Sequence, residues 1–208
     1  MDFMQMVPNP DEQGSVIGQT GSGKSVWTKK LIIPYIGKRQ IIILDPKHDD
    51  IWNGLGTIVS NPDKIWKLKF PKTEVVIYRP DGDLASDYDA YDDIFEQVYQ
   101  EGNRLLVVDE TRKVVKNAQS YGKGLDDLCT RGRKRECTRI FGMQRPVEIP
   151  RICLSESTKF YVRYVVDRRD RETIAGFSNE EIRKEVSDRY GMYYVDIRNR
   201  IVKYFSKT

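Results

Sequence analysis

An eight-residue glycine-rich segment near the start of the chain limits the fold more than any other feature of the sequence. Residues 18–25 read Gly-Gln-Thr-Gly-Ser-Gly-Lys-Ser, a complete G-x-x-x-x-G-K-[ST] pattern. Val16 and Ile17 form a short apolar run before it, and a helical pattern from Val26 to Ile33 follows and ends at Pro34. This order of strand, loop and helix is the context in which the pattern forms a phosphate-binding loop.

The residue types of this loop suit the binding of a nucleoside triphosphate. Its glycines allow backbone N–H groups to turn toward the β-phosphate, while the next helix points its positive end at the same anion. Lys24 is expected to reach the β- and γ-phosphates, and Ser25 to ligate Mg²⁺. The predicted phosphate-binding set is Gly18, Gln19, Thr20, Gly21, Ser22, Gly23, Lys24 and Ser25. A glycine-rich surface turn is the structural alternative.

The 208 residues fit one α/β domain with small appendages, and we expect an arm at residues 1–13 followed by a single P-loop domain at 14–208. The net charge is only +4 although 32% of residues are charged, so local clusters decide the basic character.

Cys129, Cys137 and Cys153 have no C-x-x-C spacing, which argues against a disulfide framework or structural zinc and favours a reducing compartment. No signal peptide or transmembrane stretch is recognisable, so a soluble protein is expected.

Continuous apolar runs alternate with helical segments, which predicts a parallel α/β sheet with right-handed crossovers. The predicted strands cover residues 14–17, 40–45, 74–78, 105–110, 138–144 and 159–166, with a terminal hairpin at 192–205. Further helices are predicted at about 86–102, 125–136, 171–177 and 179–188. Residues 1–13 are expected to be extended, 51–72 to hold a short helix with loops, and 111–124 to form a mobile loop.

Residues at four predicted strand ends are expected to meet at one edge of this sheet. They are Gly18, Asp45, Asp109 and Gln144. In open parallel sheets the ligand binds beyond the carboxyl ends of the strands, so this edge is the predicted site.

Asp109 ends a buried apolar run, where a carboxylate is costly unless a cation compensates it. A Mg²⁺ ion held together with Ser25 and the nucleotide would do so, which is the Walker B pattern. The adjacent Glu110 can reach past the metal to activate the water that attacks the γ-phosphate. The alternative is an Asp-Glu pair solvated in a turn.

Gln144 follows an apolar strand at a position where its amide can sense the γ-phosphate or orient water. A bond to the backbone alone, as a cap of the strand end, is the alternative. Asp45 and Lys47 follow the second strand, and they too could act at the phosphates or only cap the strand end.

Basic residues cluster at 131–135, on the helix before the fifth strand. An arginine from this cluster could stabilise the transferring phosphoryl group in a neighbouring subunit, and a solvated helix face is the alternative. Lys113, Lys116 and Lys123 could contact nucleic-acid phosphates in a salt-sensitive manner.

The segments GQTGSGKS, DPKH, LLVVDE and RGRKRECTRIFGMQRPVEIPRI, in this order and spacing, resemble the FtsK/HerA superfamily of P-loop DNA-pumping ATPases. The resemblance covers about residues 14–177, and its Gln-Arg-Pro strand ending is more specific than the P-loop alone. It implies a RecA-like, mainly parallel sheet flanked by helices, with ATP and Mg²⁺ as cofactors. By position it assigns the trans-acting arginine to Arg133, with Arg131 and Arg135 as alternatives. The family usually has glycine where this chain has Glu136.

Within that superfamily, a motor of about this length resembles the genome-packaging ATPases of tailless, membrane-containing icosahedral double-stranded DNA viruses. The resemblance implies a ring, expected to be a hexamer, that hydrolyses ATP and drives double-stranded DNA into a preformed capsid. It also implies partners at a capsid vertex or among membrane-associated packaging proteins, in the virion or the host-cell cytoplasm. The alternatives are a DNA helicase, a conjugation or filamentous-phage assembly ATPase, and a nucleotide-gated structural vertex protein. A small-molecule kinase fits less well, because the Gln-Arg-Pro strand has no evident use there.

Overall fold

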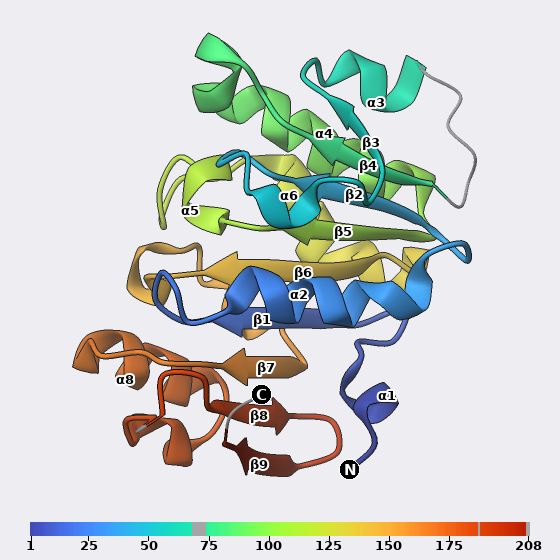
Figure 1. Cartoon of the computed structure of the whole chain (residues 1–208). Helices are drawn as coiled ribbons and strands as arrows, with labels where there is room; N and C mark the ends of the chain where they lie inside the picture. The colour runs from blue at the N-terminus through green and yellow to red at the C-terminus, as the bar shows by residue number, and fades with distance from the viewer. Residues whose placement is uncertain (68–73, 187, 207–208) are drawn as a thin grey trace.

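The computed structural model describes residues 1–67, 74–186 and 188–206, which form a nine-stranded sheet (Figure 1). The sheet order is β3-β4-β2-β5-β6-β1-β7-β8-β9. The strands are β1 Gln13–Ile17, β2 Gln40–Leu44, β3 Thr57–Val59, β4 Val75–Tyr78, β5 Arg104–Val108, β6 Thr138–Met143, β7 Lys159–Val162, β8 Met192–Asp196 and β9 Ile201–Phe205. Strands β1 to β7 are parallel, whereas β8 and β9 add to β7 as an antiparallel hairpin. The predicted fold class and the terminal hairpin are confirmed.

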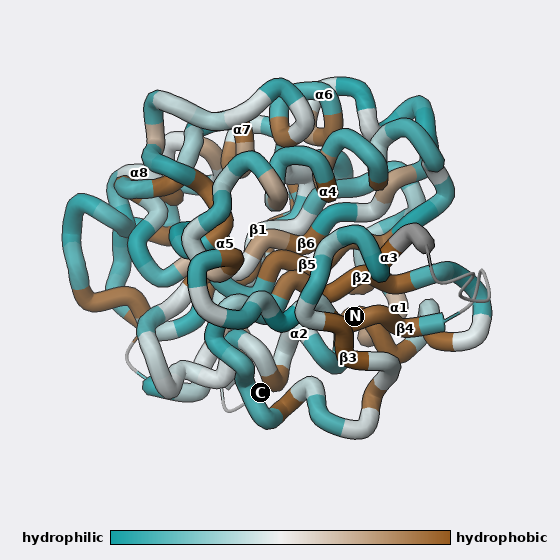
Figure 2. Tube along the Cα trace, turned by 90° about the horizontal axis from the view of Figure 1, so that it is seen from above, coloured by the Kyte–Doolittle hydropathy of each residue, from teal (hydrophilic) through white to brown (hydrophobic). Residues whose placement is uncertain are grey.

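Helices cover both faces of the sheet. Figure 2 shows α2 on one side of the strands and α4, α6 and α7 on the other. The helices are α1 Phe3–Met6, α2 Lys24–Ile32, α3 Asp63–Lys67, α4 Tyr88–Glu101, α5 Thr111–Val114, α6 Lys123–Arg131, α7 Ile152–Ser155 and α8 Arg168–Phe177. Within β2, Ile42 and Leu44 belong to one apolar core and Ile41 and Ile43 to the other. The strands therefore read as unbroken apolar runs because both of their faces are buried.

Several predicted elements differ from the structure in type or extent. β3 was not predicted, because this edge strand has only three residues and two of them are exposed. The predicted helix at 125–136 is α6 followed by a 3₁₀ turn, η4 Gly132–Arg135, and the predicted mobile loop at 111–124 contains α5. Among the described residues of the predicted helix at 179–188, only the 3₁₀ helix η6 Glu180–Arg183 is helical, and residue 187 lies outside the described residues. Residues 68–72 of the segment 51–72 lie outside the described residues.

The first twelve residues are bonded to the edge of the sheet and are not extended throughout. Asp2 and Gln5 form a capping box on α1. The Lys159 ammonium, 2% exposed, lies 2.9 Å from a carboxylate oxygen of Asp196 and donates to the Gln5 carbonyl at 3.0 Å. A buried lysine is stable only when such acceptors surround it, so this cluster fastens the first residues to β7 and β8.

α6 packs closely on α4 at Gly124, where there is no room for a side chain. An added Cβ would lie 2.2 Å from the backbone oxygen of Asp92, whereas at Gly176, inside α8, no atom lies within 4 Å. We expect Gly124→Ala to lower the free energy of unfolding by about 1–3 kcal/mol through steric overlap. Gly176→Ala is the matched control and should raise it by up to about 1 kcal/mol through helix propensity. Chemical denaturation of both variants checks this, and equal behaviour would contradict the predicted overlap.

Candidate functional site

Sheet order brings the predicted site residues together. β6 lies between β1, which leads into the P-loop, and β5, which ends before Asp109. Gln144, directly after β6, therefore stands between the P-loop and Asp109. These residues line a hollow of about 290 Å³ at the edge where the parallel strands end. Lys24, Ser25, Lys47, Asp109, Glu110 and Gln144 are among its lining residues.

The P-loop backbone has the conformation that its glycines predict. Gly21 and Gly23 have φ angles of +75° and +84°, which L-residues with side chains rarely adopt. Gly23 precedes α2, and no side chain caps that end of the helix. The first N–H groups of α2 therefore face the hollow as an anion-binding end.

Lys24 is 8% exposed, and its ammonium donates to the Gln19 carbonyl at 3.3 Å. Burial lowers the pKa of Lys24 and the neighbouring Lys47 lowers it further, while the Glu110 carboxylate opposes both effects. A triphosphate in the hollow would supply the negative charge that this buried ammonium favours.

Asp109 is 7% exposed, and its burial raises its pKa to about 6. A hydrogen bond with the Ser25 side chain and the charge of Lys24 act in the opposite direction, whereas Asp49 and Asp45 raise the pKa further. The local charge balance therefore favours an additional cation. The Asp109 carboxylate and the Ser25 hydroxyl are oxygen ligands of the kind that Mg²⁺ prefers, so the residues fit that ion.

Glu110 is held by two donors on one carboxylate oxygen. Lys47 lies 2.6 Å from Oε2 of Glu110, and the Gln144 amide donates to the same atom. Thr20 of the P-loop in turn donates to the Gln144 amide oxygen at 3.0 Å. Side chains from four separate loops thus form one hydrogen-bonded chain across the site. Gln144 bonds to side chains here and not to the backbone alone.

Asp45 and Lys47 have different environments. Asp45 is fully buried and accepts from the Arg79 guanidinium at 2.7 Å and from the Asp49 amide at 2.9 Å. It therefore shapes the loop after β2, whereas Lys47 reaches Glu110 in the hollow.

The three candidate arginines lie at the opposite edge of the sheet, before β6. Arg133 is 69% exposed and pairs with Asp11 at 3.2 Å. Arg131 pairs with Asp127 at 3.0 Å, and Arg135 lies over the Tyr99 ring at 5.4 Å. Since β6 has six residues, about 20 Å of strand separates this cluster from the hollow of the same chain.

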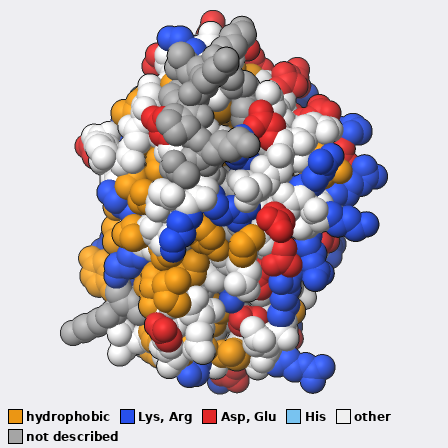
Figure 3. Space-filling model, turned by 90° about the vertical axis from the view of Figure 1, so that its right-hand side faces the viewer, with side chains coloured by type: hydrophobic (Ala, Val, Ile, Leu, Met, Phe, Trp, Pro, Cys, Tyr) orange, Lys and Arg blue, Asp and Glu red, His pale blue; other side chains and the backbone are white. Residues whose placement is uncertain are grey.

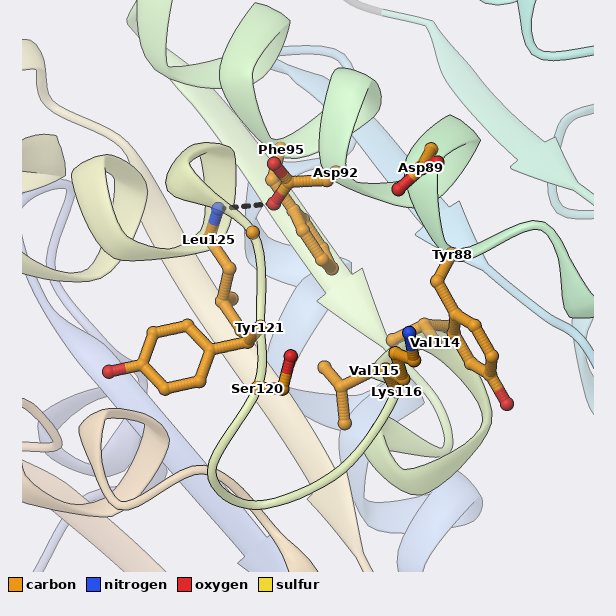
Figure 4. A pocket seen from close by; sticks show the side chains of 11 residues that line it. Tyr88, Asp89, Asp92, Phe95, Val114, Val115, Lys116, Ser120, Tyr121 and Leu125 are labelled. Carbon is orange, nitrogen blue, oxygen red and sulfur yellow. Dashed lines mark hydrogen bonds between the residues drawn. The ribbon is translucent and has the colours of Figure 1, made fainter.

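The segment after Glu110 carries the predicted DNA-contacting lysines. Lys113 and Lys116 are exposed, and the exposed Lys123 pairs with Asp127. Figure 4 shows Lys116 beside Val114 and Val115 at a hollow between this segment and α4. Asp92 of α4 accepts from the backbone of Leu125, and this bond seats the start of α6.

Arg163 is a site residue that was not predicted. Its guanidinium donates to the carbonyl of Ser22 in the P-loop and, at 2.9 Å, to the carbonyl of Tyr190. It directly follows β7, as Asp109 follows β5 and Gln144 follows β6. The predicted strand at 159–166 placed Arg163 inside a strand, whereas β7 ends at Val162, so its strand-end position became visible only in the structure.

None of the helices within the described residues is both long and apolar enough to cross a membrane.

Known proteins resemble the chain in sequence and in fold. No family model matches it. It is 28% identical over 181 residues to the DNA packaging ATPase P9 of Enterobacteria phage PRD1, covering 86% of this chain and 75% of P9. The genome packaging NTPase B204 of Sulfolobus turreted icosahedral virus 2, in complex with ATP-gammaS, superposes with a TM-score of 0.77 and 19% identity, covering 96% of this chain and 99% of B204. VirB4 of Thermoanaerobacter pseudethanolicus gives a TM-score of 0.66 and 12% identity, covering 94% and 89% of the two chains. The chain is therefore homologous to P9 and has the fold of B204.

The raised pKa of Asp109 makes a pH-dependent contribution to stability that can be measured without divalent metal. The folded protein binds this proton more tightly than the unfolded chain does, so the contribution is fully present below pH 3.8 and is lost as the pH rises through about 6. Relative to wild type, Asp109→Asn should gain up to about 3 kcal/mol of unfolding free energy between pH 4 and pH 7. Urea unfolding in EDTA checks this, with the exposed Asp83→Asn as the control. Parallel pH profiles of wild type and Asp109→Asn would contradict it.

Proposed function

We propose that this protein hydrolyses ATP to drive double-stranded DNA into a preformed viral capsid. The hydrogen-bonded chain from Thr20 through Gln144 to Glu110 and Lys47 supports hydrolysis most directly, because it joins the phosphate-binding loop to a carboxylate that can activate water. The DNA substrate is inferred from homology to a protein named as a DNA packaging ATPase.

In this proposal, the backbone of residues 18–25 and the Lys24 ammonium bind the triphosphate. Ser25 and Asp109 hold Mg²⁺, which when bound neutralises negative charge on the phosphates. Glu110 is the general base that takes the proton of the attacking water. Gln144 is the sensor of the γ-phosphate, and its bonds to Thr20 and Glu110 couple the P-loop to that base.

Lys47 and Gln144 position Glu110 in this mechanism. Both donate to the same oxygen, Oε2, so they restrain the carboxylate in one orientation. An amide and an ammonium can also donate to a phosphate oxygen. Competition between the γ-phosphate and Glu110 for these two donors would link nucleotide binding to release of the base.

We further propose a head-to-tail ring, a hexamer, in which Arg133 acts on the neighbour's nucleotide. The cluster lies too far from its own hollow to act within one chain, and contacts between unlike edges close into rings. Figure 3 shows the side on which the parallel strands begin, where basic side chains gather on one flank and hydrophobic ones mainly toward the other, with acidic side chains between them. Met4 and Ile33, each 55% exposed, contribute apolar surface at this edge.

The lysines after Glu110 are the proposed contacts to DNA phosphates. Lys113, Lys116 and Lys123 come 3, 6 and 13 residues after Glu110, and phosphate contacts of this kind do not depend on base sequence. A capsid vertex or membrane-associated packaging proteins are the proposed partners, in the virion or the host cytoplasm. Residues 14–208 are proposed as one ATPase domain with 1–13 as an arm.

ATPase rates with and without double-stranded DNA test the function. We expect DNA to stimulate turnover in wild type, and Glu110→Gln to reduce turnover by about 10²–10⁴-fold while ATP binding persists, because only the proton acceptor is lost. Turnover retained in Glu110→Gln would refute the assignment of the base. Strand separation would indicate a helicase instead, and negligible turnover with or without DNA would indicate a nucleotide-gated structural protein.

Mixing two variants tests the action of Arg133 in trans. Lys24→Ala removes a phosphate ligand but retains Arg133. Arg133→Ala removes the arginine but retains an intact P-loop. Each alone should lose about 10³-fold or more of the ATPase rate. An equal mixture should recover activity, because roughly a quarter of its interfaces pair an intact P-loop with an intact Arg133.

No recovery in that mixture would contradict the assignment of Arg133. Arg131→Ala and Arg135→Ala are the comparison variants. If one of them loses activity alone and recovers it when mixed with Lys24→Ala, that arginine acts in trans in place of Arg133. Mass measurement of the assemblies reports the ring size.

A further inference from the structure

A second hollow, of about 170 Å³, adjoins the P-loop on the side of β7. Its lining includes Trp27 of α2, Arg163 after β7, and Tyr190 before β8. Gly23 and Val26 line both this hollow and the one that contains Lys24 and Asp109. The two spaces therefore meet at the first turn of α2, where a ligand bound by its phosphates in one can extend into the other.

Val26, Trp27 and Tyr190 give the second hollow apolar and aromatic surface, and the basic residues Lys30 and Arg163 also line it. Val26 is 49% exposed and Tyr190 is 52% exposed, so two of the more exposed hydrophobic side chains of the described residues lie here together. Trp27 is 5% exposed, and the Lys30 ammonium lies over its ring at 5.5 Å. Planar heteroaromatic rings bind to surfaces of this kind through stacking and apolar contact.

The backbone that carries Tyr190 is fixed relative to the P-loop. Arg163 donates to the carbonyls of both Ser22 and Tyr190, and so joins the phosphate-binding loop to the segment before β8. The amide of Tyr190 donates to the Asp188 carboxylate at 2.9 Å. Because these contacts involve the backbone atoms of Tyr190, they do not depend on its side chain.

We propose that this hollow binds the base of the nucleotide, with Tyr190 as the stacking residue and Val26 as a second apolar contact. The assignment rests on the proposed function, because it places a base next to phosphates bound at residues 18–25. Tyr190 is then a residue that sets affinity for the nucleoside part of the ligand, separately from the phosphate ligands of the P-loop.

Binding of two ligands separates the base from the phosphates. Calorimetry with Mg²⁺ measures the affinity for ATPγS, which carries the base, and for inorganic tripolyphosphate, which does not. Tyr190→Ala should weaken ATPγS binding by about 5- to 150-fold, the range expected for loss of one base–aromatic stack. Its tripolyphosphate affinity should stay within about twofold of wild type, because the backbone contacts to Arg163 and Asp188 persist.

Tyr190→Phe keeps the ring and should bind ATPγS like wild type, as should Tyr121→Ala, which removes an exposed tyrosine from another part of the molecule. The proposal is overturned if Tyr190→Ala binds ATPγS normally. It is also overturned if that variant weakens both ligands equally, since this would indicate a distorted P-loop. If wild type binds neither ligand, the proposed ATPase function fails instead.

Discussion

Burial of two adjacent carboxylates at the end of β5 is the interaction on which the site depends. Asp109 and Glu110 are each less than a tenth exposed, and charge at such positions is costly without compensation. The chain compensates them unequally. Glu110 has an ion pair with Lys47. Asp109 has a hydrogen bond with the Ser25 hydroxyl, and the favourable charge of Lys24 is opposed by the nearby carboxylates of Asp49 and Asp45. One carboxylate is thus paired within the protein, and the other is suited to bind a divalent cation.

The parallel sheet gives its two edges different roles. Loops at the carboxyl ends bring the P-loop, Lys47, Glu110 and Gln144 within hydrogen-bonding reach of one another, although they are far apart in sequence. The amino ends carry the basic cluster of residues 131–135 and exposed apolar residues. β6 belongs to both edges, since the cluster precedes it and Gln144 follows it. A rigid, buried strand therefore connects the two surfaces that a head-to-tail ring would bring together.

The sequence predicted those features that follow from local patterns. Apolar runs located the buried strands of the parallel sheet, and the glycine-rich motif located the P-loop. The edge strand β3 was missed because its short, exposed pattern resembles a loop. The sequence could not show that Asp45 pairs with Arg79 while Lys47 reaches Glu110, because both follow the same strand and only tertiary packing distinguishes them. Arg163 was overlooked because it belongs to no motif and because the predicted strand at 159–166 extended past it, whereas β7 ends at Val162.

Glu136 has a backbone conformation suited to glycine, the residue that the sequence resemblance led us to expect at this position. Its φ of +56° is the left-handed conformation that glycine adopts freely, and a side chain there costs roughly 1–2 kcal/mol. Surrounding contacts hold the turn: the Asn103 amide donates to the Arg135 carbonyl at 2.7 Å, and Arg39 donates to the Glu136 carbonyl. Strain of this size persists only where neighbouring structure determines the conformation. The turn between η4 and β6 is therefore fixed, and it presents the arginine cluster at a defined place on the sheet edge.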